Sequence, residues 1–191
     1  MRIALFHNLP SGGAKRTVYE QVRRLARSHS VYGYAITTAN RDFFDVSPYL
    51  SAEHVTPYEP WSLLRSPVGR LNQAIRIANL LRLRRIQRRI AEAISSGGYD
   101  AAIVHPCMFT FSPTLLRHLS TPSVYYRQDP VRWVHDPSPT RPRDKNGRLR
   151  RSLDAVDPLR ASYRRLLVHE DRTSMLAATR VVTSSCFMHE I

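Results

Sequence analysis

The sequence predicts an α/β fold built on a doubly wound, mainly parallel sheet. Short apolar runs of strand length alternate along the chain with longer segments whose apolar residues recur at helical spacing. A Gly-Gly turn separates the first run from the first helical segment, as in the opening unit of such sheets. The 191 residues suffice for one domain with a substantial core. This alternation predicts a sheet with helices on both faces.

The chain opens with a strand, a turn, a helix and a second strand. Residues 2–6 are a short apolar run that predicts a buried strand. A turn at 7–13 leads into a helix predicted over 14–28, and residues 31–37 predict the second strand. This order is the first unit of a doubly wound sheet.

The middle of the chain is predicted to be irregular and then helical. Four prolines interrupt residues 38–68, where a weak strand is expected near 54–56. A helix is predicted from about 68 to 96 and ends at the glycine pair 97–98. The apolar residues that predict its buried face are Leu71, Ala74, Ile75, Ala78, Leu81, Ile86, Ile90 and Ile94.

The second half adds three predicted strands and two predicted helices. The strands cover 99–106, 123–127 and 180–184, and the helices cover 113–119 and 159–178. The first of these strands is expected to stop at its proline. Six strands in a Rossmann-like sheet would have the order 3-2-1-4-5-6 and bind ligands beyond their carboxyl ends.

Several classes of protein are disfavoured by composition. No stretch approaches the ~18 uninterrupted apolar residues that a membrane span needs. The first apolar run is too short for a secretory signal. Two cysteines, Cys107 and Cys186, do not form a disulfide framework, so we expect a cytoplasmic protein. They also lack metal-ligand spacing with histidine, so we expect no zinc site and no other metal.

A large excess of positive charge predicts an anionic partner. The chain has 29 Lys and Arg against 15 Asp and Glu, a formal net charge of +14. Nucleic acid, a phosphorylated substrate or an acidic lipid surface would suit this charge. A coding bias toward arginine is the alternative, because only Lys15 and Lys145 of the 29 basic residues are lysines.

The basic residues are dense in two segments, 65–89 and 141–165. The first segment interleaves arginines with aliphatic rather than aromatic residues, which disfavours nucleic acid and favours an amphipathic helix on an anionic surface. A solvated helix face is the alternative. A Pro- and Arg-rich loop over 136–158 is expected to act with this helix. The predicted membrane or anion surface consists of Arg82, Arg84, Arg85, Arg88 and Arg89.

The turn Ser11-Gly12-Gly13 is a candidate anion site. Two glycines let a ligand approach the backbone, and a helix N-terminus presents free N–H groups. The turn matches neither the dinucleotide fingerprint nor a Walker A loop. A plain tight turn is the alternative reading.

Two further candidates follow predicted strands. His105 stands where a neutral imidazole could orient or deprotonate a hydroxyl, although a lone histidine is often structural. Arg127, Gln128 and Asp129 could bind hydroxyls and phosphate, or Arg127 and Asp129 could form a salt bridge at the strand end.

Three segments in order resemble family-4 glycosyltransferases of the GT-B fold. The opening residues 1–16 are similar to the first strand and Gly-Gly turn of that family. Residues 97–106 resemble its Tyr-Asp-apolar-apolar-His strand, and residues 177–187 resemble the strand that closes its N-terminal domain. The three segments span nearly the whole chain.

The resemblance implies transfer of a sugar from a nucleotide diphosphate-sugar to an acceptor hydroxyl, with retained configuration, no cofactor and no obligatory metal. The acceptor would be a sugar or lipid, lipid-linked or phosphorylated. Gly12 and Gly13 would lie against the donor diphosphate, and His105 near the sugar and acceptor. Candidates for acceptor binding, by position, are Asn8, Lys15, Arg16, Arg127, Gln128 and Asp129.

The resemblance also sets an expected domain division. Residues 1–184 correspond to the N-terminal, acceptor-side domain, and 185–191 to the start of the interdomain linker. The family's donor-binding domain, with its basic pair and Glu-x7-Glu motif, is not within the 191 residues, so a further domain or partner subunit is expected. The alternative function is a non-catalytic Rossmann-like module that binds an anion, either nucleic acid or a partner subunit.

Overall fold

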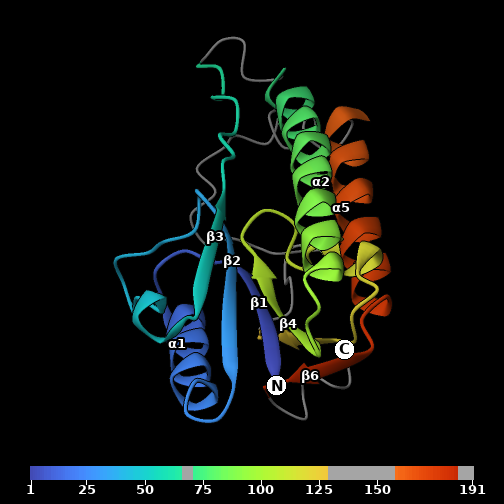
Figure 1. The fold of residues 1–191 in the computed structure, drawn as a ribbon. Helices are drawn as coiled ribbons and strands as arrows, with labels where there is room; N and C mark the ends of the chain where they lie inside the picture. Colours follow the sequence, from blue (N-terminus) through green and yellow to red (C-terminus); the bar gives the residue numbers. More distant parts are fainter. Residues whose placement is uncertain (66–70, 129–157, 185–191) are drawn as a thin grey trace.

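The fold is a six-stranded, all-parallel sheet. The computed structural model describes residues 1–65, 71–128 and 158–184. The strands are β1 (Arg2–Asn8), β2 (Ser30–Ile36), β3 (Ala52–Thr56), β4 (Ala101–Cys107), β5 (Ser123–Arg127) and β6 (Arg180–Thr183). Their spatial order is β3-β2-β1-β4-β5-β6, and every neighbouring pair is parallel (Figure 1). This confirms the predicted doubly wound, Rossmann-like sheet and its strand order.

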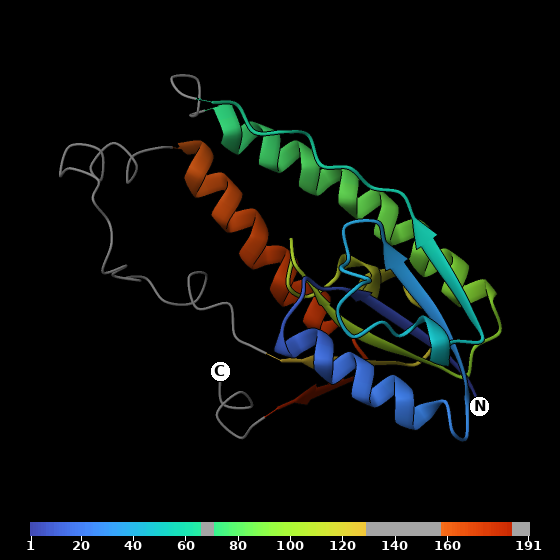
Figure 2. The ribbon, with the colours of Figure 1, turned by 90° about the vertical axis from the view of Figure 1, so that its left-hand side faces the viewer.

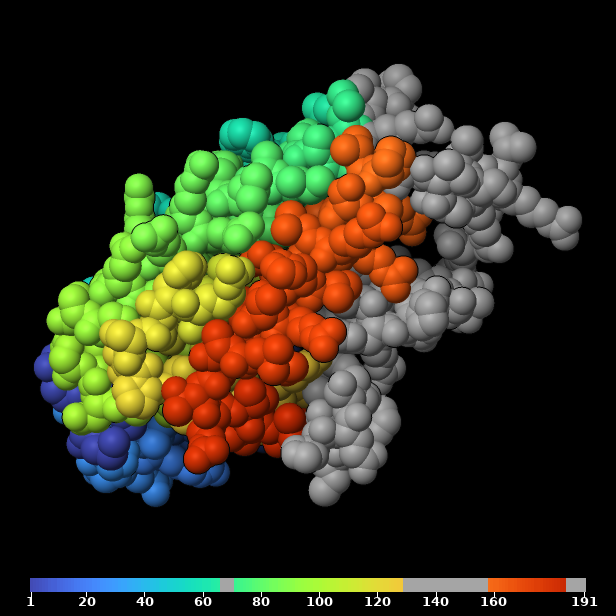
Figure 3. Space-filling model, turned by 90° about the vertical axis from the view of Figure 1, so that its right-hand side faces the viewer, coloured from blue at the N-terminus to red at the C-terminus, as the bar shows by residue number. Residues whose placement is uncertain are grey.

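Helices cover both faces of the sheet. On one face lies α1 (Gly13–Leu25), and on the other lie α2 (Asn72–Ser96), α5 (Pro158–Leu176) and the short 3-10 helix η3 (Thr114–His118), with a 3-10 turn η1 (Ser47–Tyr49) after β2 (Figures 1 and 2). The α2 and α5 helices contact each other, both contact η3, and the three together form one surface of the molecule (Figure 3). Their N-terminal halves rise beyond the carboxyl ends of the strands (Figure 1).

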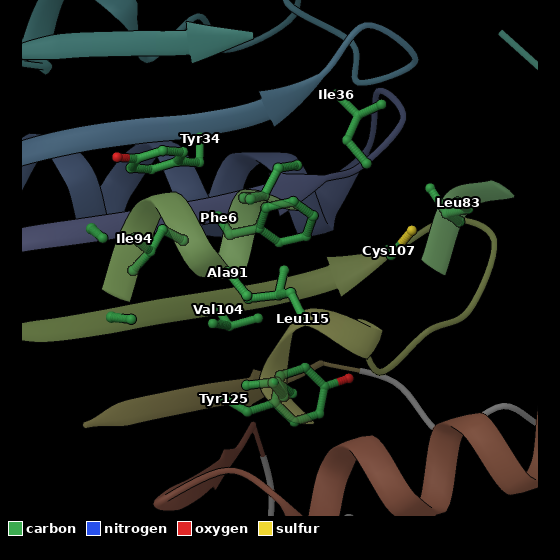
Figure 4. Packing of buried hydrophobic residues seen from close by; sticks show 14 of the residues in the cluster. Phe6, Tyr34, Ile36, Leu83, Ala91, Ile94, Val104, Cys107, Leu115 and Tyr125 are labelled. Atoms are coloured by element: carbon green, nitrogen blue, oxygen red, sulfur yellow. The ribbon is translucent and has the colours of Figure 1, made fainter. Parts of the chain in front are cut away.

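Strand alternation divides the core into two clusters. Ala4 and Phe6 of β1 face α2, whereas Leu5, between them, packs with Val18 and Val22 of α1. Figure 4 shows Phe6 in the larger cluster, together with side chains from α2, β4, β5 and η3. Side-chain parity along each strand therefore decides on which side of the sheet a functional group lies.

The buried face of α2 differs from the predicted one. Ile90 and Ile94 are buried as expected, but Leu71 and Leu81 are exposed. In the part of α2 that precedes Ile90, the buried residues are Leu80, Leu83 and the polar Gln87. Because α2 is apolar on more than one side, periodicity alone selected residues from two stripes.

The prediction that the fourth strand stops at Pro106 is wrong. The pairing of β1 with β4 runs from Phe6 opposite Val104 to Asn8 opposite Cys107, so β4 carries one extra residue. Such a bulge tolerates a proline, which has no N–H for the ladder, and bends the strand. It also reverses the parity of β4, so Cys107 joins the cluster that faces α2.

Buried carboxylates attach α5 to the rest of the domain. Asp171 accepts hydrogen bonds from the Ser112 amide, at 3.1 Å, and from its hydroxyl, at 2.6 Å. Glu170 is fully buried and lies 3.5 Å from the guanidinium groups of both Arg84 and Arg117. These partners compensate the desolvation of the two carboxylates.

None of the helices in the described ranges is both long and apolar enough to cross a membrane.

Candidate functional site

Four polar side chains meet at the carboxyl edge of the sheet, on the face that α1 covers. His7 and His105 lie near the ends of β1 and β4, and Gln128 directly follows β5. Lys15 comes from the first turn of α1. We call these four residues the basic site. The site sits where a doubly wound sheet places its ligands.

Lys15 is a buried cation beside a histidine. Its side chain is 1% exposed, and its Nζ lies 3.3 Å from Nε2 of His7. In the described part of the chain Lys15 forms no salt bridge. Burial lowers the pKa of Lys15, and the more distant charges of Asp45 and Glu53 offset this only in part. An unneutralised cation at this depth favours an anionic ligand.

His105 is also buried, and its amide partner indicates its tautomer. Gln128 Nε2 lies 3.4 Å from Nδ1 of His105 and donates to the carbonyl of Ala14 at 3.2 Å. With Nδ1 accepting, the ring proton is assigned to Nε2, and that atom has no hydrogen-bond partner among the described residues. His105 therefore offers a buried N–H donor, which suits orienting an oxygen better than removing a proton.

Both histidines of the basic site are neutral near pH 7. Burial, first, and the charge of Lys15, second, lower the pKa of His105 to about 3. Burial, then Lys15 and His105, lower the pKa of His7 well below its ordinary value. With Nε2 of His7 facing the Lys15 ammonium, its proton belongs on Nδ1, which is likewise unpartnered within the described ranges.

The Gly12-Gly13 turn leaves open space at the N-terminus of α1. Gly12 has φ 148°, a conformation that favours glycine. Among the described residues, a Cβ added to Gly12 or Gly13 would meet no atom within 4 Å. In the same part of the chain no side chain caps the helix, and its first turn holds no acidic residue. The structure thus places a glycine turn and a helix N-terminus next to the buried Lys15.

Asn8 is occupied by contacts within the protein. Its amide donates to Sγ of Cys107 at 3.3 Å, and its carbonyl accepts from the Thr38 hydroxyl at 2.9 Å. The side chain is fully buried on the α2 side of β1. These bonds disfavour the prediction that Asn8 binds an acceptor and instead make it a link between β1, β4 and the loop after β2.

Arg127 lies on the opposite face from the basic site. It shares the parity of Tyr125, and its guanidinium donates to Sδ of Met175 and lies 3.7 Å from Asp171, both on α5. The expectation that Arg127 binds an acceptor beside His105 therefore conflicts with its position. Arg16 is exposed on α1, 6.0 Å from the Phe44 ring centre, and Asp129 lies outside the described residues.

Two members of the predicted arginine surface are engaged inside the protein. Arg82 stacks 4.8 Å from the ring centre of Trp61 and 5.9 Å from that of Tyr58. Arg84 forms part of the buried ion cluster of Glu170. Neither guanidinium is free to act as part of one continuous basic face.

The other three arginines remain exposed on α2. Arg88 pairs with Glu92 at 3.0 Å, an exposed contact that contributes little to stability. Arg85 and Arg89 are exposed beside it. The five predicted residues thus separate into a structural pair and an exposed set of three.

Sequence reasoning missed His7 as a member of the site. The predicted strand ended at Phe6, whereas β1 continues to Asn8 and brings the His7 ring under α1. A histidine that continues the alternation of a buried strand was the available signal. In the described ranges, no three His, Cys, Asp or Glu side chains are grouped so that they could hold a metal ion.

Comparisons with known proteins give the following similarities. No protein-family model and no curated protein matches the chain. Among solved structures, CalG4, the calicheamicin glycosyltransferase, is 18% identical over 65% of this chain and 32% of its own, with a TM-score of 0.41. UGT89C1 of Arabidopsis thaliana, complexed with UDP-L-rhamnose, is 12% identical over 96% and 44%, with a TM-score of 0.49. A UGT transferase from Siraitia grosvenorii, in complex with UDP, is 11% identical over 70% and 29%, with a TM-score of 0.38.

The chain spans less than half the length of each of these three glycosyltransferases. Because every TM-score is below 0.5 and every identity is below 25%, the likenesses support neither a shared mechanism nor a shared substrate. The sheet order and the basic site stand on the geometry of this chain.

Proposed function

We propose that this chain is the acceptor-side domain of a glycosyltransferase that uses a nucleotide diphosphate-sugar. The observation that carries the proposal is the buried Lys15 beneath an uncapped Gly12-Gly13 helix start, beside the N–H donor of His105. A diphosphate needs both a cation and converging N–H groups, and this turn offers them together.

In the proposed reaction, the bond between the sugar's anomeric carbon and the diphosphate breaks as a bond to the acceptor oxygen forms. The acceptor's hydroxyl proton passes to the departing diphosphate. Lys15 and the first amides of α1 stabilise the charge that develops on the diphosphate. The Nε2–H of His105 orients a hydroxyl of the sugar or acceptor. Retained configuration and independence of a metal come from the family resemblance.

The donor half of this proposal is tested by diphosphate binding. Calorimetric titration with UDP and with pyrophosphate should show binding that Lys15→Met weakens by about tenfold or more. This variant should fold, because it removes a buried charge and keeps the length of the side chain. Arg24→Gln, which removes an exposed charge at the far end of α1, is the matched control. Equal losses in both variants, or no binding of either compound, would contradict the proposed site.

We also propose that residues 1–184 form the N-terminal domain, that 185–191 begin a linker, and that a donor-binding domain belongs to the same enzyme. Reading the gene beyond codon 191 tests this directly. A second α/β domain with a basic pair and Glu-x7-Glu supports the proposal. The enzyme extended to that domain should transfer sugar, and His105→Ala should lower the rate by about a hundredfold or more. A stop codon, with no neighbouring frame for such a domain, would favour the non-catalytic anion-binding module.

The anion-binding surface that we propose for a membrane or lipid-linked acceptor is reduced to Arg85, Arg88 and Arg89. Replacing all three with glutamine should lower binding to vesicles that contain acidic lipid, because each surface arginine contributes about 1 kcal/mol. The same number of charges removed at Arg23 and Arg24 of α1 and at Arg27 just after it provides the control. Unchanged vesicle binding by the α2 variant would contradict the proposal, and salt-sensitive binding to RNA or DNA would favour the alternative.

A further inference from the structure

A cavity lies on the opposite side of the sheet from the basic site. It has a volume of about 440 Å³ and opens between α2, α5 and the segment that follows β3. Four aromatic and three aliphatic side chains dominate its wall: Tyr58, Trp61, Phe109, Tyr163, Leu63, Leu80 and Leu83. Both its size and its apolar lining are those of a small-molecule site.

The outer wall of this cavity is fixed in place. Residues 58–64, which we call the strap, run beside α2 (Figure 2). The Asn79 side chain accepts from the Trp61 amide at 2.8 Å and donates to the Trp61 carbonyl at 3.1 Å. Asn72, seven residues earlier on α2, makes the same pair of bonds with Leu64 at 2.7 and 3.0 Å. Because these two pairs of hydrogen bonds already hold the strap extended, a ligand that binds there would not have to order it.

Two apolar side chains of the strap are exposed in the part of the chain that the structure describes. Trp61 is 55% exposed and Leu63 is 47% exposed, and both line the cavity. The Tyr58 hydroxyl is engaged with the carbonyl of Asn79 at 3.0 Å, which keeps the Tyr58 ring in the wall. Pinned, exposed aromatic surface around a cavity is typical of a binding site.

Among the described residues that line the cavity, the charged one is a cation, Arg76. Arg76 lines it and lies close enough to Tyr163 to oppose the rise that burial causes in the Tyr163 pKa. Behind the wall, Arg82 stacks on Trp61 and Tyr58, and its Nη1 has no hydrogen-bond partner among the described residues. No acidic side chain lines the cavity in the described part of the chain.

We propose that this cavity binds a small aromatic compound that carries one anionic group, a phosphate or a carboxylate. The ring system packs between Trp61, Phe109 and Tyr163, and the anion is held by Arg76 at the rim. The site goes beyond the proposed sugar transfer and does not depend on it, because the basic site lies under α1 on the other face of the sheet.

The experiment uses the indole N–H resonances of the ¹⁵N-labelled chain. There are two tryptophans, so Trp61→Phe assigns the Trp61 resonance. Titration with 1-naphthyl phosphate should shift this resonance. Inorganic phosphate at the same concentrations should not shift it, and 1-naphthol should shift it with lower affinity.

Two variants test where the anion and the ring of the ligand bind. Arg76→Gln should weaken 1-naphthyl phosphate about tenfold and leave 1-naphthol unchanged, because it removes the partner of the anion only. Ser62→Phe, at an exposed position in the wall, should fill the cavity and abolish binding of both compounds. Arg24→Gln, an equal loss of exposed charge on α1, is the control.

Equal weakening by Arg76→Gln and Arg24→Gln would show general attraction to a basic surface and overturn the proposal. So would a Trp61 shift caused by inorganic phosphate alone, or no shift with 1-naphthyl phosphate. Lys15→Met should leave this titration unchanged, so the outcome is separate from that of the diphosphate site.

Discussion

Gly12 is the residue whose backbone the proposed diphosphate site depends on most. Its φ of 148° lies in a region that side chains disfavour, although nothing nearby would collide with a Cβ. Gly13, the next residue, starts the helix with equally open surroundings. Alanine at Gly12 and alanine at Gly13 therefore differ in backbone conformation and not in the room available for a Cβ.

Gly12→Ala should lower the free energy of unfolding by about 1–3 kcal/mol, because alanine is strained at this φ. Gly13→Ala should leave it unchanged or raise it by up to about 1 kcal/mol, because helical φ suits alanine. Urea unfolding of the two variants measures both values. Similar losses in the two would contradict the conformational role of Gly12.

His105 should make stability depend on pH. Its pKa is about 3 in the folded protein against the ordinary 6.5, so below pH 6.5 the unfolded chain binds more protons. Stability is therefore complete above pH 6.5 and falls as the pH drops toward 3. Between pH 7 and about 4.5, this one group accounts for about 2–3 kcal/mol.

His105→Asn should remove the part of the pH dependence of unfolding free energy that His105 causes. Urea unfolding at pH 7 and at about 4.5 should show that the variant loses about 2–3 kcal/mol less than the unaltered chain. The residual loss belongs to the other groups, His7 among them. An equal loss in both proteins would mean that His105 is not held neutral by burial.

At the scale of elements, the strap and α2 show how polar side chains determine packing that apolar spacing does not. The apolar residues of α2 predicted a helix, but not which stripe is buried or that Asn72 and Asn79 bind a distant backbone segment. Asparagines on a helix face have no local signature of such a partner. The strap's position therefore required the tertiary structure.

Asn79→Ala should free the strap around Trp61. Two hydrogen bonds are lost, at a cost of about 1–3 kcal/mol in the free energy of unfolding. The Trp61 indole resonance should move toward the value of a solvated tryptophan. Asn72→Ala, which breaks the equivalent clamp at Leu64, should cost a similar amount and leave the Trp61 resonance closer to its original place. Identical spectra for the two variants would contradict the separate clamps.

The bulge in β4 is a second feature at this scale. A proline after a strand usually indicates its end, and here the sheet accommodates Pro106 with one extra residue. His105 faces the basic site by plain alternation from Ile103, and the extra residue then turns Cys107 toward Gln87 and Asn8. Strand alternation, by contrast, predicts that the side chains of Arg127 and Gln128 point to opposite faces of the sheet.

At the scale of the whole molecule, Asp171 joins three distant parts of the chain. It holds the Ser112 segment and lies beside Arg127 of β5, all within the protein interior. Asp171→Ala should cost about 3–5 kcal/mol, because it leaves a buried guanidinium without its partner. Glu92→Ala, which breaks the exposed pair with Arg88, should cost at most about 1 kcal/mol. Chemical denaturation compares the two, and equal costs would contradict the structural role of Asp171.

The sequence by itself determined the elements, their order and the location of a ligand edge. Those features follow from local periodicity and from the chirality of β-α-β connections, which allow few arrangements. Gly12, Gly13, His105 and Gln128 were predicted from their places at strand and helix ends, and Lys15 was predicted from the family resemblance, as an acceptor-binding residue. The tertiary structure alone decided that Lys15 is buried against His7, that Arg127 belongs to α5, and that the strap and the two long helices enclose an aromatic cavity. The reason is that burial and charge neutralisation depend on residues that are distant in sequence, about which a local pattern carries no information.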